Sequence, residues 1–266
     1  MINIIILTTD QIRHKFFINY LFKQKEFNII ACFVEKNLHD HYHKKISKLQ
    51  KKHFNIRLKK EKKFFSKYSK IKLKNFFFIQ PKQISKSRKF SNYLRMKNYD
   101  YVVSFGCSII GDDLLKINRQ KFINIHLGLS PYYLGSGTNF WPFVNNELQF
   151  LGATIMRTEK KIDKGKILHQ IRPDIKKDND IHDVGNQIIY KIVKDLKFVL
   201  KNQFKLKNKI FRFTKYKTKT YKRKHFDDQS LEKAYKNIEY GMIKDYLGKK
   251  KKLEKKYKIL NLKKLI

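Results

Sequence analysis

The chain opens with two apolar segments that flank an amphipathic one. Residues 2–7 (INIIIL) form a nearly continuous Ile-rich run, which is typical of a strand buried on both faces of a parallel sheet. The apolar positions that follow recur at helical spacing and predict a helix over about 12–25. A second apolar run over 27–34 (FNIIACFV) completes a β-α-β unit. This opening predicts a right-handed crossover and an α/β fold with a parallel sheet.

The same patterns predict elements along the rest of the chain. We expect short buried strands over 76–79, 100–105 and 122–126, strands over 150–157 and 167–172, and helices over 39–74, 85–96, 181–202 and 230–247. The helix over 181–202 is clearly marked, because apolar residues recur every four positions from Val184 to Leu196. No Gly/Ser- or Pro-rich linker marks a boundary. The last sixty residues are basic, and we expect a compact domain over 1–200 with a basic, partly helical C-terminal extension over 201–266.

The composition is strongly basic, with 62 Lys and Arg against 22 Asp and Glu and a formal net charge of +40. Such a surface attracts nucleic acid or acidic lipid. However, the enriched residue types, such as Lys, Ile, Asn and Phe, have A/T-rich codons, and the segment 101–159 is neutral. We interpret the charge as a solvated lysine-rich surface and expect no nucleic-acid partner.

Several classes of protein are excluded by what the chain lacks. Its two cysteines, Cys32 and Cys107, are too few for a disulfide scaffold or a Cys-based zinc site. The alternating histidines of 39–43 (HDHYH) have no evident fourth ligand, so we expect no metal site. The first strand-to-helix turn, 7–14, contains no glycine, which argues against an NAD or FAD site. With no signal peptide and no run of about 18 apolar residues, a soluble cytoplasmic protein is expected.

The candidate chemistry lies in residues 122–170. Asn124 and His126 project to the same face at the carboxyl end of a predicted buried strand, where open α/β sheets bind ligands. Asp163 follows in a second loop. An amide, an imidazole and a carboxylate can together stabilise an oxyanion and move a proton. The sequence therefore indicates acyl-transfer chemistry, although a lone Asn or His in a strand is most often structural.

Three other features have plainer interpretations. Ser130 lacks the flanking glycines of a nucleophile elbow, so we expect it to shape a loop. The run 135–137 (GSG) can cradle a phosphate, but a bent loop beside Trp141 explains it more simply. Cys107 follows a predicted buried strand, and we expect a buried cysteine there rather than a reactive one.

The order of five short motifs resembles the folate-dependent formyltransferase family. The motifs are N-I-H (124–126), L-S-P-Y-Y-x-G (129–135), W-P (141–142), G-A-T-I (152–155) and I-D-x-G-x-I (162–167). That family includes glycinamide ribonucleotide, methionyl-tRNA and sugar N-formyltransferases, which move a formyl group from 10-formyltetrahydrofolate to an amine. The resemblance implies a Rossmann-like fold, with a mostly parallel twisted sheet and helices on both faces, over the catalytic domain 1–200.

The resemblance also implies roles for individual residues. Asn124 would donate a hydrogen bond to the formyl oxygen, His126 as imidazolium would stabilise the oxyanion, and Asp163 would support the charged imidazole. Two loops would line the pteridine pocket of the donor, with Phe105, Gly106, Cys107, Ser108, Ile109, Glu159 and Ile162 as the candidate binding residues.

Further motifs resemble a bacterial group of this family that is often met with surface-polysaccharide genes. They are R-H-x-F-F (13–17), H-F-x-x-R-x-x-x-E-x-x-F-F (53–65) and the run 135–142 (GSGTNFWP). We therefore expect the acceptor to be the amine of a nucleotide-linked amino sugar. Glycinamide ribonucleotide, aminoacylated tRNA and water, as in a formyltetrahydrofolate hydrolase, stay open as acceptors. The non-enzymatic alternative is a basic RNA- or membrane-binding module on an inactive scaffold.

Overall fold

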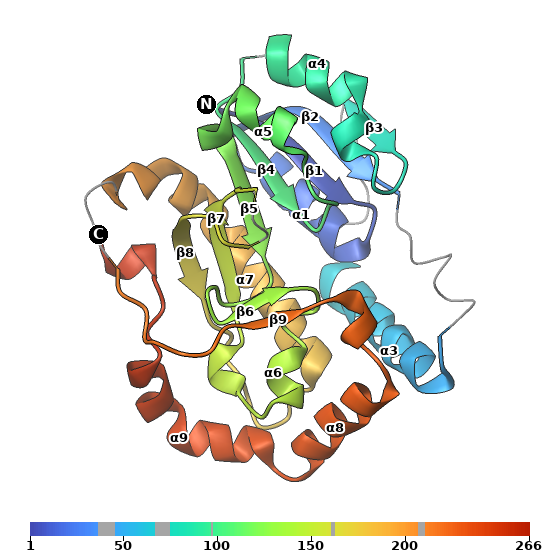
Figure 1. Ribbon diagram of the computed structural model, residues 1–266, viewed down its shortest axis with the longest axis vertical. Coiled ribbons are helices and arrows are strands. Elements are labelled where there is room, and N and C mark those ends of the chain that lie inside the picture. Colours follow the sequence, from blue (N-terminus) through green and yellow to red (C-terminus); the bar gives the residue numbers. More distant parts are fainter. Residues whose placement is uncertain (37–45, 67–74, 97, 161–162, 207–210) are drawn as a thin grey trace. The chain divides into compact units, whose positions relative to one another are not determined.

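A seven-stranded sheet organises the chain in the computed structural model, which describes residues 1–36, 46–66, 75–96, 98–160, 163–206 and 211–266 (Figure 1). The strand order is β3-β2-β1-β4-β5-β7-β8. The strands are β1 (Ile2–Thr9), β2 (Phe27–Glu35), β3 (Phe76–Ile79), β4 (Tyr101–Phe105), β5 (Phe122–His126), β7 (Ala153–Arg157) and β8 (Ile167–Ile171). The pairs β1–β2, β1–β4, β2–β3 and β4–β5 are all parallel. The predicted α/β class and the opening β-α-β unit are confirmed.

The chain divides into two compact units, here called unit 1 and unit 2. Unit 1 comprises Met1–Lys45, Glu61–Ile125 and Met156–Lys166, and unit 2 comprises Ile46–Lys60, His126–Ile155 and Ile167–Ile266. Unit 1 therefore holds β1 to β4, while unit 2 holds β8 and a second, two-stranded sheet of β6 (Tyr133–Gly135) and β9 (Lys219–Tyr221). The predicted boundary near residue 200 stays a prediction.

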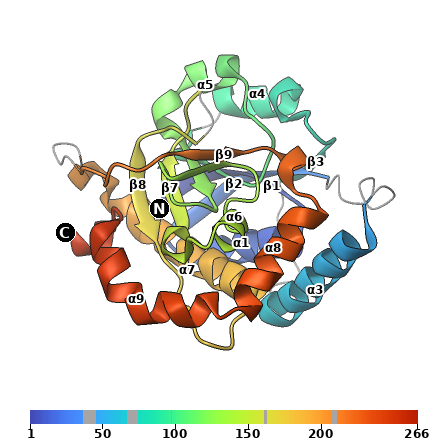
Figure 2. The same ribbon diagram turned by 60° about the horizontal axis from the view of Figure 1, so that its bottom comes forward.

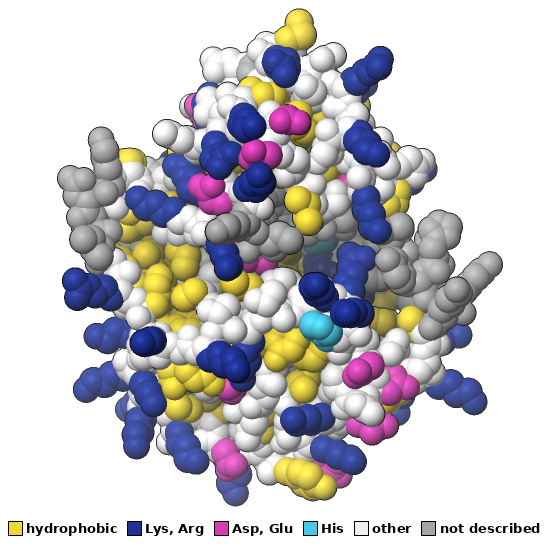
Figure 3. Space-filling model, in the orientation of Figure 1, with side chains coloured by type: hydrophobic (Ala, Val, Ile, Leu, Met, Phe, Trp, Pro, Cys, Tyr) yellow, Lys and Arg dark blue, Asp and Glu magenta, His cyan; other side chains and the backbone are white. Residues whose placement is uncertain are grey.

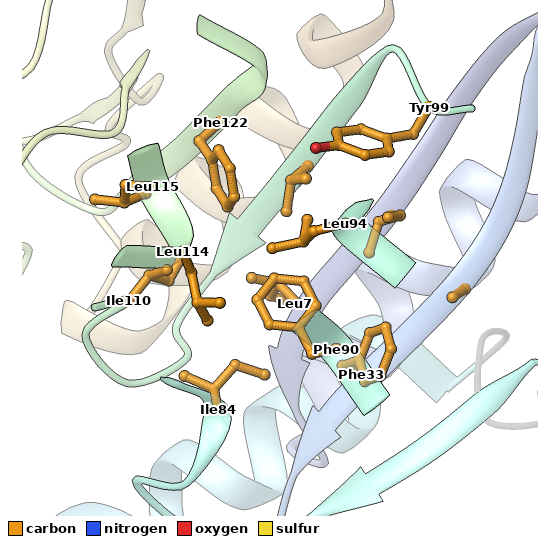
Figure 4. Close-up of a cluster of buried hydrophobic side chains, with 13 residues drawn as sticks. Leu7, Phe33, Ile84, Phe90, Leu94, Tyr99, Ile110, Leu114, Leu115 and Phe122 are labelled. Atoms are coloured by element: carbon orange, nitrogen blue, oxygen red, sulfur yellow. The ribbon is translucent and has the colours of Figure 1, made fainter. Parts of the chain in front are cut away.

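Helices cover both faces of the strands of unit 1. On one face α4 (Arg88–Met96) and α5 (Asp112–Ile117) contribute to a buried cluster (Figure 4). The cluster consists of Ile5, Leu7, Ala31, Phe33, Ile84, Phe90, Leu94, Tyr99, Val102, Ile110, Leu114, Leu115 and Phe122. On the other face, Phe17 of α1 (Ile12–Phe22) packs edge-on against Phe105. Because both faces are covered, β1 needs apolar side chains at successive positions, which explains its unbroken Ile-rich sequence.

Unit 2 is mostly helical. Its long helix α7 (Ile181–Asn202) has the predicted bounds and begins with a capping box, in which Asp180 and Asp183 each accept from the other's backbone N–H. The other helices are α6 (Trp141–Val144), α8 (Asp228–Glu239) and α9 (Met242–Lys256), and the first part of α3 (Lys48–Phe65) also belongs here.

The prediction of one helix over 230–247 is wrong. The structure has α8 and α9 instead, and the chain changes direction between them (Figure 2). Gly241 lies at the break with φ +85°, a left-handed conformation that suits glycine and ends a helix. The apolar spacing continues across this glycine, so the pattern alone did not reveal the break.

Other element boundaries differ by a few residues. Helix α1 ends at Phe22, α4 begins at Arg88 after a 3-10 turn, and β7 begins at Ala153 after another. Of the predicted helical segment 39–74, α3 is confirmed. The stretches 39–45 and 67–74 lie outside the described residues.

Three further features of the described residues concern surface charge, membrane-spanning helices and metal binding. Lys and Arg side chains are spread over the visible face rather than gathered in one patch (Figure 3). None of the described helices has the length and apolar character needed to cross a membrane. Within the same residues no group of three or more His, Cys, Asp or Glu is arranged to hold a metal ion. The histidines of 39–43 lie outside the described residues.

Candidate active site

Asn124 is held by a hydrogen bond from the neighbouring strand. It lies in β5 directly opposite Ser104 of β4. The buried Ser104 hydroxyl lies 3.0 Å from Asn124 Oδ1 and 3.2 Å from the Ile123 carbonyl oxygen, and these two acceptors share its single proton. Because the amide oxygen accepts from Ser104, the Nδ2 group is the part of Asn124 oriented to donate elsewhere. This orientation suits a side chain that stabilises developing negative charge on a substrate oxygen.

His126 is buried, and its ring has a defined backbone partner. Nε2 lies 3.0 Å from the carbonyl oxygen of Tyr133. A carbonyl oxygen can only accept, so Nε2 carries a proton and donates it to this bond. Gly128 is fitted to this ring, because a Cβ at that position would lie 2.5 Å from His126 Nε2 and 2.7 Å from Thr138. No other residue type can occupy position 128 without moving the imidazole.

Asp163 lies in the hairpin between β7 and β8. It is half-buried with φ +54°, a conformation that Asp tolerates better than most residues. The hairpin is closed by Arg157 N–H donating to the Lys166 carbonyl (2.9 Å). It is tight at Gly165, where a Cβ would lie 1.7 Å from the Arg157 carbonyl oxygen.

The hairpin is long enough to bring Asp163 alongside Asn124. Thr158 N–H donates to the Phe122 carbonyl at the start of β5 (3.0 Å). Five extended residues reach about 17 Å, whereas Asn124 is only two strand residues, or about 7 Å, beyond Phe122. Chain length therefore permits the pairing, and the membership of Asp163 in a catalytic trio stays a prediction.

The loop after β4 begins in the core of unit 1. The Phe105 ring is buried against His14 (4.6 Å between ring centroids), and its carbonyl accepts from the Thr8 hydroxyl (2.8 Å). The ring packs inside unit 1, and the predicted role of Phe105 in donor binding stays a prediction. Gly106 has φ +71°, and a Cβ there would lie 2.5 Å from the His14 ring. Position 106 therefore requires glycine for two reasons, the positive φ of the backbone and the close approach of the His14 ring.

A buried glutamate that the sequence analysis missed holds this loop. Glu35 ends β2 and is only 3% exposed. Its carboxylate accepts from the Ser108 backbone N–H (2.7 Å), from the Ser108 hydroxyl (2.6 Å) and from the Ile84 N–H (3.4 Å). The signal in the sequence is a single charged residue at the end of an apolar run, FNIIACFVE. Glu35 therefore fixes the centre of the predicted donor loop.

The remaining loop residues differ in environment. Cys107 is half-buried, and burial together with the nearby Glu35 carboxylate raises the pKa of its thiol to about 12. The thiol is therefore protonated at neutral pH and is not a reactive nucleophile. The Ile109 side chain is 68% exposed, and its carbonyl accepts from the Ser85 hydroxyl (2.9 Å).

The second predicted wall is only partly described. Glu159 forms an ion pair with Arg119 (3.1 Å), whose guanidinium also binds Asp112 (2.7 Å). Ile162 lies outside the described residues. The pocket role of both residues stays a prediction.

The glycine-rich loop of 135–137 has the predicted bent form. Gly135 has φ +90°, and a Cβ there would lie 2.2 Å from the Tyr221 carbonyl oxygen. The Trp141 indole donates to the Ser136 carbonyl (2.8 Å). The glycines are explained by these close approaches, so the loop beside Trp141 is confirmed. The buried Ser130 has its backbone fixed on both sides, by Thr154 and Gln170, as expected of a residue that shapes a loop.

Comparison with known proteins decides the family. A sequence model described as formyl transferase matches residues 22–194. The chain belongs to the formyl transferase family. The resemblance predicted from the motifs is confirmed.

Curated relatives align with part of the chain. It is 33% identical over 149 residues to a bifunctional polymyxin resistance protein ArnA of Wigglesworthia glossinidia brevipalpis, covering 54% of this chain and 22% of the relative. It is 29% identical over 140 residues to a methionyl-tRNA formyltransferase of Malacoplasma penetrans, covering 51% and 43%. The chain thus matches less than half the length of these relatives.

Solved formyltransferases share the fold. A sugar N-formyltransferase from Shewanella superimposes with a TM-score of 0.56 at 20% identity over 88% of both chains. A phosphoribosylglycinamide formyltransferase from Anaplasma phagocytophilum gives 0.55 at 13% identity, over 84% of this chain and 98% of the other. At such identities the likeness concerns the fold, and it confirms the predicted Rossmann-like formyltransferase architecture.

The residues of this chain fit a folate donor at some positions and not at others. Asn124 presents an amide donor, and the exposed backbone of Gly106 and side chain of Ile109 offer a surface for a flat ring. In contrast, the Phe105 carbonyl, the Ser108 N–H and the Ile109 carbonyl already serve internal hydrogen bonds. Contacts to a pteridine are therefore expected from the other backbone groups of 106–110.

Proposed function

We propose that this chain transfers a formyl group from 10-formyltetrahydrofolate to the amine of a nucleotide-linked amino sugar. The proposal rests chiefly on one observation in a chain of this family. Two residues of β5, Asn124 and His126, each have one polar atom fixed by the protein, by Ser104 and by Tyr133 respectively. Asn124 is thereby oriented with its Nδ2 group as the donor, and the His126 ring is oriented with Nε2 toward the Tyr133 carbonyl.

The residues would act at the carbon and nitrogen that react. The donor supplies the formyl group. Asn124 Nδ2 donates to the formyl oxygen as this oxygen gains negative charge, and loss of one such donor typically costs 10²–10³ in kcat. His126, protonated at Nδ1, adds positive charge near that oxygen, and Asp163 supports this charge. As the new bond to the acceptor amine forms, a proton moves from that amine to the departing nitrogen of the donor.

The sugar acceptor is favoured by the motifs of 13–17, 53–65 and 135–142, and the similarity in fold to a sugar N-formyltransferase is consistent with it. The test is direct. The protein is incubated with 10-formyltetrahydrofolate and, separately, with amino-sugar nucleotides, glycinamide ribonucleotide, charged initiator tRNA or no acceptor. Mass spectrometry then shows which compound gains a formyl group. Formylation of the tRNA alone would contradict the sugar acceptor and identify tRNA as the acceptor. Release of formate without an acceptor would identify water instead.

Variants test the trio. We expect Asn124→Ala, His126→Ala and Asp163→Asn each to reduce turnover by at least a hundredfold. The matched control is Asp113→Asn, which makes the same change of charge at an exposed position. Turnover near that of the control in His126→Ala or Asp163→Asn, in folded protein, would refute the assignment.

A further inference from the structure

The C-terminal part of the chain supplies a strand beside the segment that follows His126. Strand β9 pairs in parallel with β6, with Tyr133 opposite Lys219 (Figure 1). Lys219 N–H donates to the Tyr132 carbonyl (2.8 Å), and Ser136 N–H donates to the Tyr221 carbonyl (2.8 Å). These two bonds lie on either side of Tyr133. The backbone whose carbonyl accepts from His126 is therefore held by residues more than eighty positions later in the chain.

The Tyr133 side chain is held by a second set of contacts. Its ring is fully buried, and its hydroxyl donates to the Glu147 carboxylate and accepts from Asn145 Nδ2 (2.9 Å). Asn145 also donates to the hydroxyl of Tyr221 in β9 (2.8 Å). Side chain and backbone of Tyr133 are thus both tied to β9.

Glu147 provides a second connection between Tyr133 and the segment that contains β9, in addition to the one through Asn145. Besides the Tyr133 hydroxyl, its carboxylate accepts from the Tyr216 hydroxyl and from Lys219 Nζ (2.7 Å). Burial and the adjacent carboxylate raise the pKa of both phenols well above the usual range, so both remain donors at physiological pH. Lys219 provides the positive charge that balances the carboxylate. Removal of this cation would leave a largely buried negative charge with neutral partners only.

We propose that the segment Tyr216–Tyr221 positions the imidazole of His126 by fixing the carbonyl group of Tyr133. An immobile carbonyl at Nε2 holds the proton there and so selects the Nε2–H form of the ring. Tyr216, Lys219 and Tyr221 are accordingly positioning residues that act through Tyr133. The inference deepens the proposed function, since it rests on His126 being catalytic.

The inference is tested by the protonation of the His126 ring. Long-range ¹H–¹⁵N spectra report which ring nitrogen carries the proton, and His126→Ala identifies the signal. We expect the Nε2–H form in the wild type and a measurable Nδ1–H fraction in Lys219→Met. The matched control is Lys217→Met, which removes the same charge from an exposed position of the same segment. A spectrum of Lys219→Met identical to that of the control would overturn the proposal.

Kinetics provide the second measurement. We expect kcat to fall about tenfold in Lys219→Met and in Tyr216→Phe, the loss of about one hydrogen bond, with KM for the donor unchanged. Lys219→Arg, which keeps the charge, should restore most of the rate. A rise in KM for the donor in both variants, with kcat unchanged, would contradict the proposal. If Lys219→Met does not fold, Tyr221→Phe serves as the test variant in its place, because this change removes only one hydroxyl group. The spectra need no acceptor, so they decide the proposal even if no formyl transfer is observed.

Discussion

At the scale of single residues, the sequence identified the polar groups but not the partners that orient them. Asn124 and His126 stand out because two polar residues at i and i+2 interrupt an apolar strand. Ser104 and Tyr133 do not stand out, because their roles depend on strand pairing and on a turn that return them to β5. Glu35 was missed for the same reason, since its three donors come from residues 49 to 73 positions later.

Ser104→Ala should separate orientation from catalysis. Without the hydroxyl, the Asn124 amide loses the bond that sets its direction. We expect kcat to fall three- to tenfold, about the value of one neutral hydrogen bond, while the protein stays folded. Steady-state kinetics with the accepted substrate give the comparison. Ser91→Ala, in α4, is the control, and an equal effect in both variants would remove Ser104 from the site.

Glu35→Gln should loosen the donor loop. The Gln amide group can accept only through its oxygen, so at least one of the two Ser108 donors loses its partner, at a cost of about 1–3 kcal/mol. We expect a lower melting temperature and a smaller stabilisation by 5-formyltetrahydrofolate, since the stabilisation of the folded protein by a ligand grows with the logarithm of the ligand's affinity. Glu232→Gln, at an exposed position, is the control. An undiminished folate shift in Glu35→Gln would show that the loop does not depend on this carboxylate.

At the scale of elements, long periodic segments were predicted well and short or irregular ones poorly. The bounds of α7 and β5 follow directly from the sequence. The pairing of β6 with β9 does not, because three-residue strands show no usable alternation and lie far apart in the sequence. The break at Gly241 was missed because a glycine in a helical pattern is compatible with both continuation and termination.

Two glycines of the C-terminal helices provide a matched pair. A Cβ at Gly241 or at Gly248 would contact nothing within 4 Å, so only backbone conformation distinguishes them. Gly241→Ala places alanine at φ +85° and should destabilise the protein by about 1–2 kcal/mol. Gly248→Ala lies within α9 and should stabilise it by about 0.5–1 kcal/mol. Urea denaturation gives both values, and a change of the same sign in both variants would contradict the assigned break.

At the scale of the whole molecule, the sequence predicted the class of fold and the family, whereas the division into compact units was not foreseen. The units interleave along the chain, with crossings near residues 45, 60, 125, 155 and 166. None of these positions carries the Pro-, Gly- or Ser-rich composition that marks a linker. The composition of the sequence therefore contains no signal from which these crossings could be predicted.

Global stability should depend on pH through His53 of unit 2. This side chain is buried, with Tyr235 OH 2.8 Å from Nδ1, and burial together with the neighbouring His182 and Arg57 lowers its pKa to about 3. The unfolded chain binds a proton near pH 6.5, but the folded protein does not until about pH 3. Stability is therefore lost as the pH falls through this window, by about 2 kcal/mol between pH 7 and pH 5.

The variant His53→Gln lacks this titration and should lose less stability over the same range. Urea denaturation of the wild type, His53→Gln and the exposed His225→Gln at pH 7 and pH 5 gives the comparison. Equal losses in the wild type and His53→Gln would show that His53 is protonated when folded.

The role proposed for β9 also sets a limit on when the protein can become active during its synthesis. Residues 122–135 emerge from the ribosome well before residues 216–221, so the nascent chain exposes an unpaired β6 edge and a Glu147 carboxylate without Lys219. Until translation passes Tyr221, the Tyr133 carbonyl lacks the support described above. The growing polypeptide is therefore expected to acquire turnover late, after most of its parallel sheet has already formed.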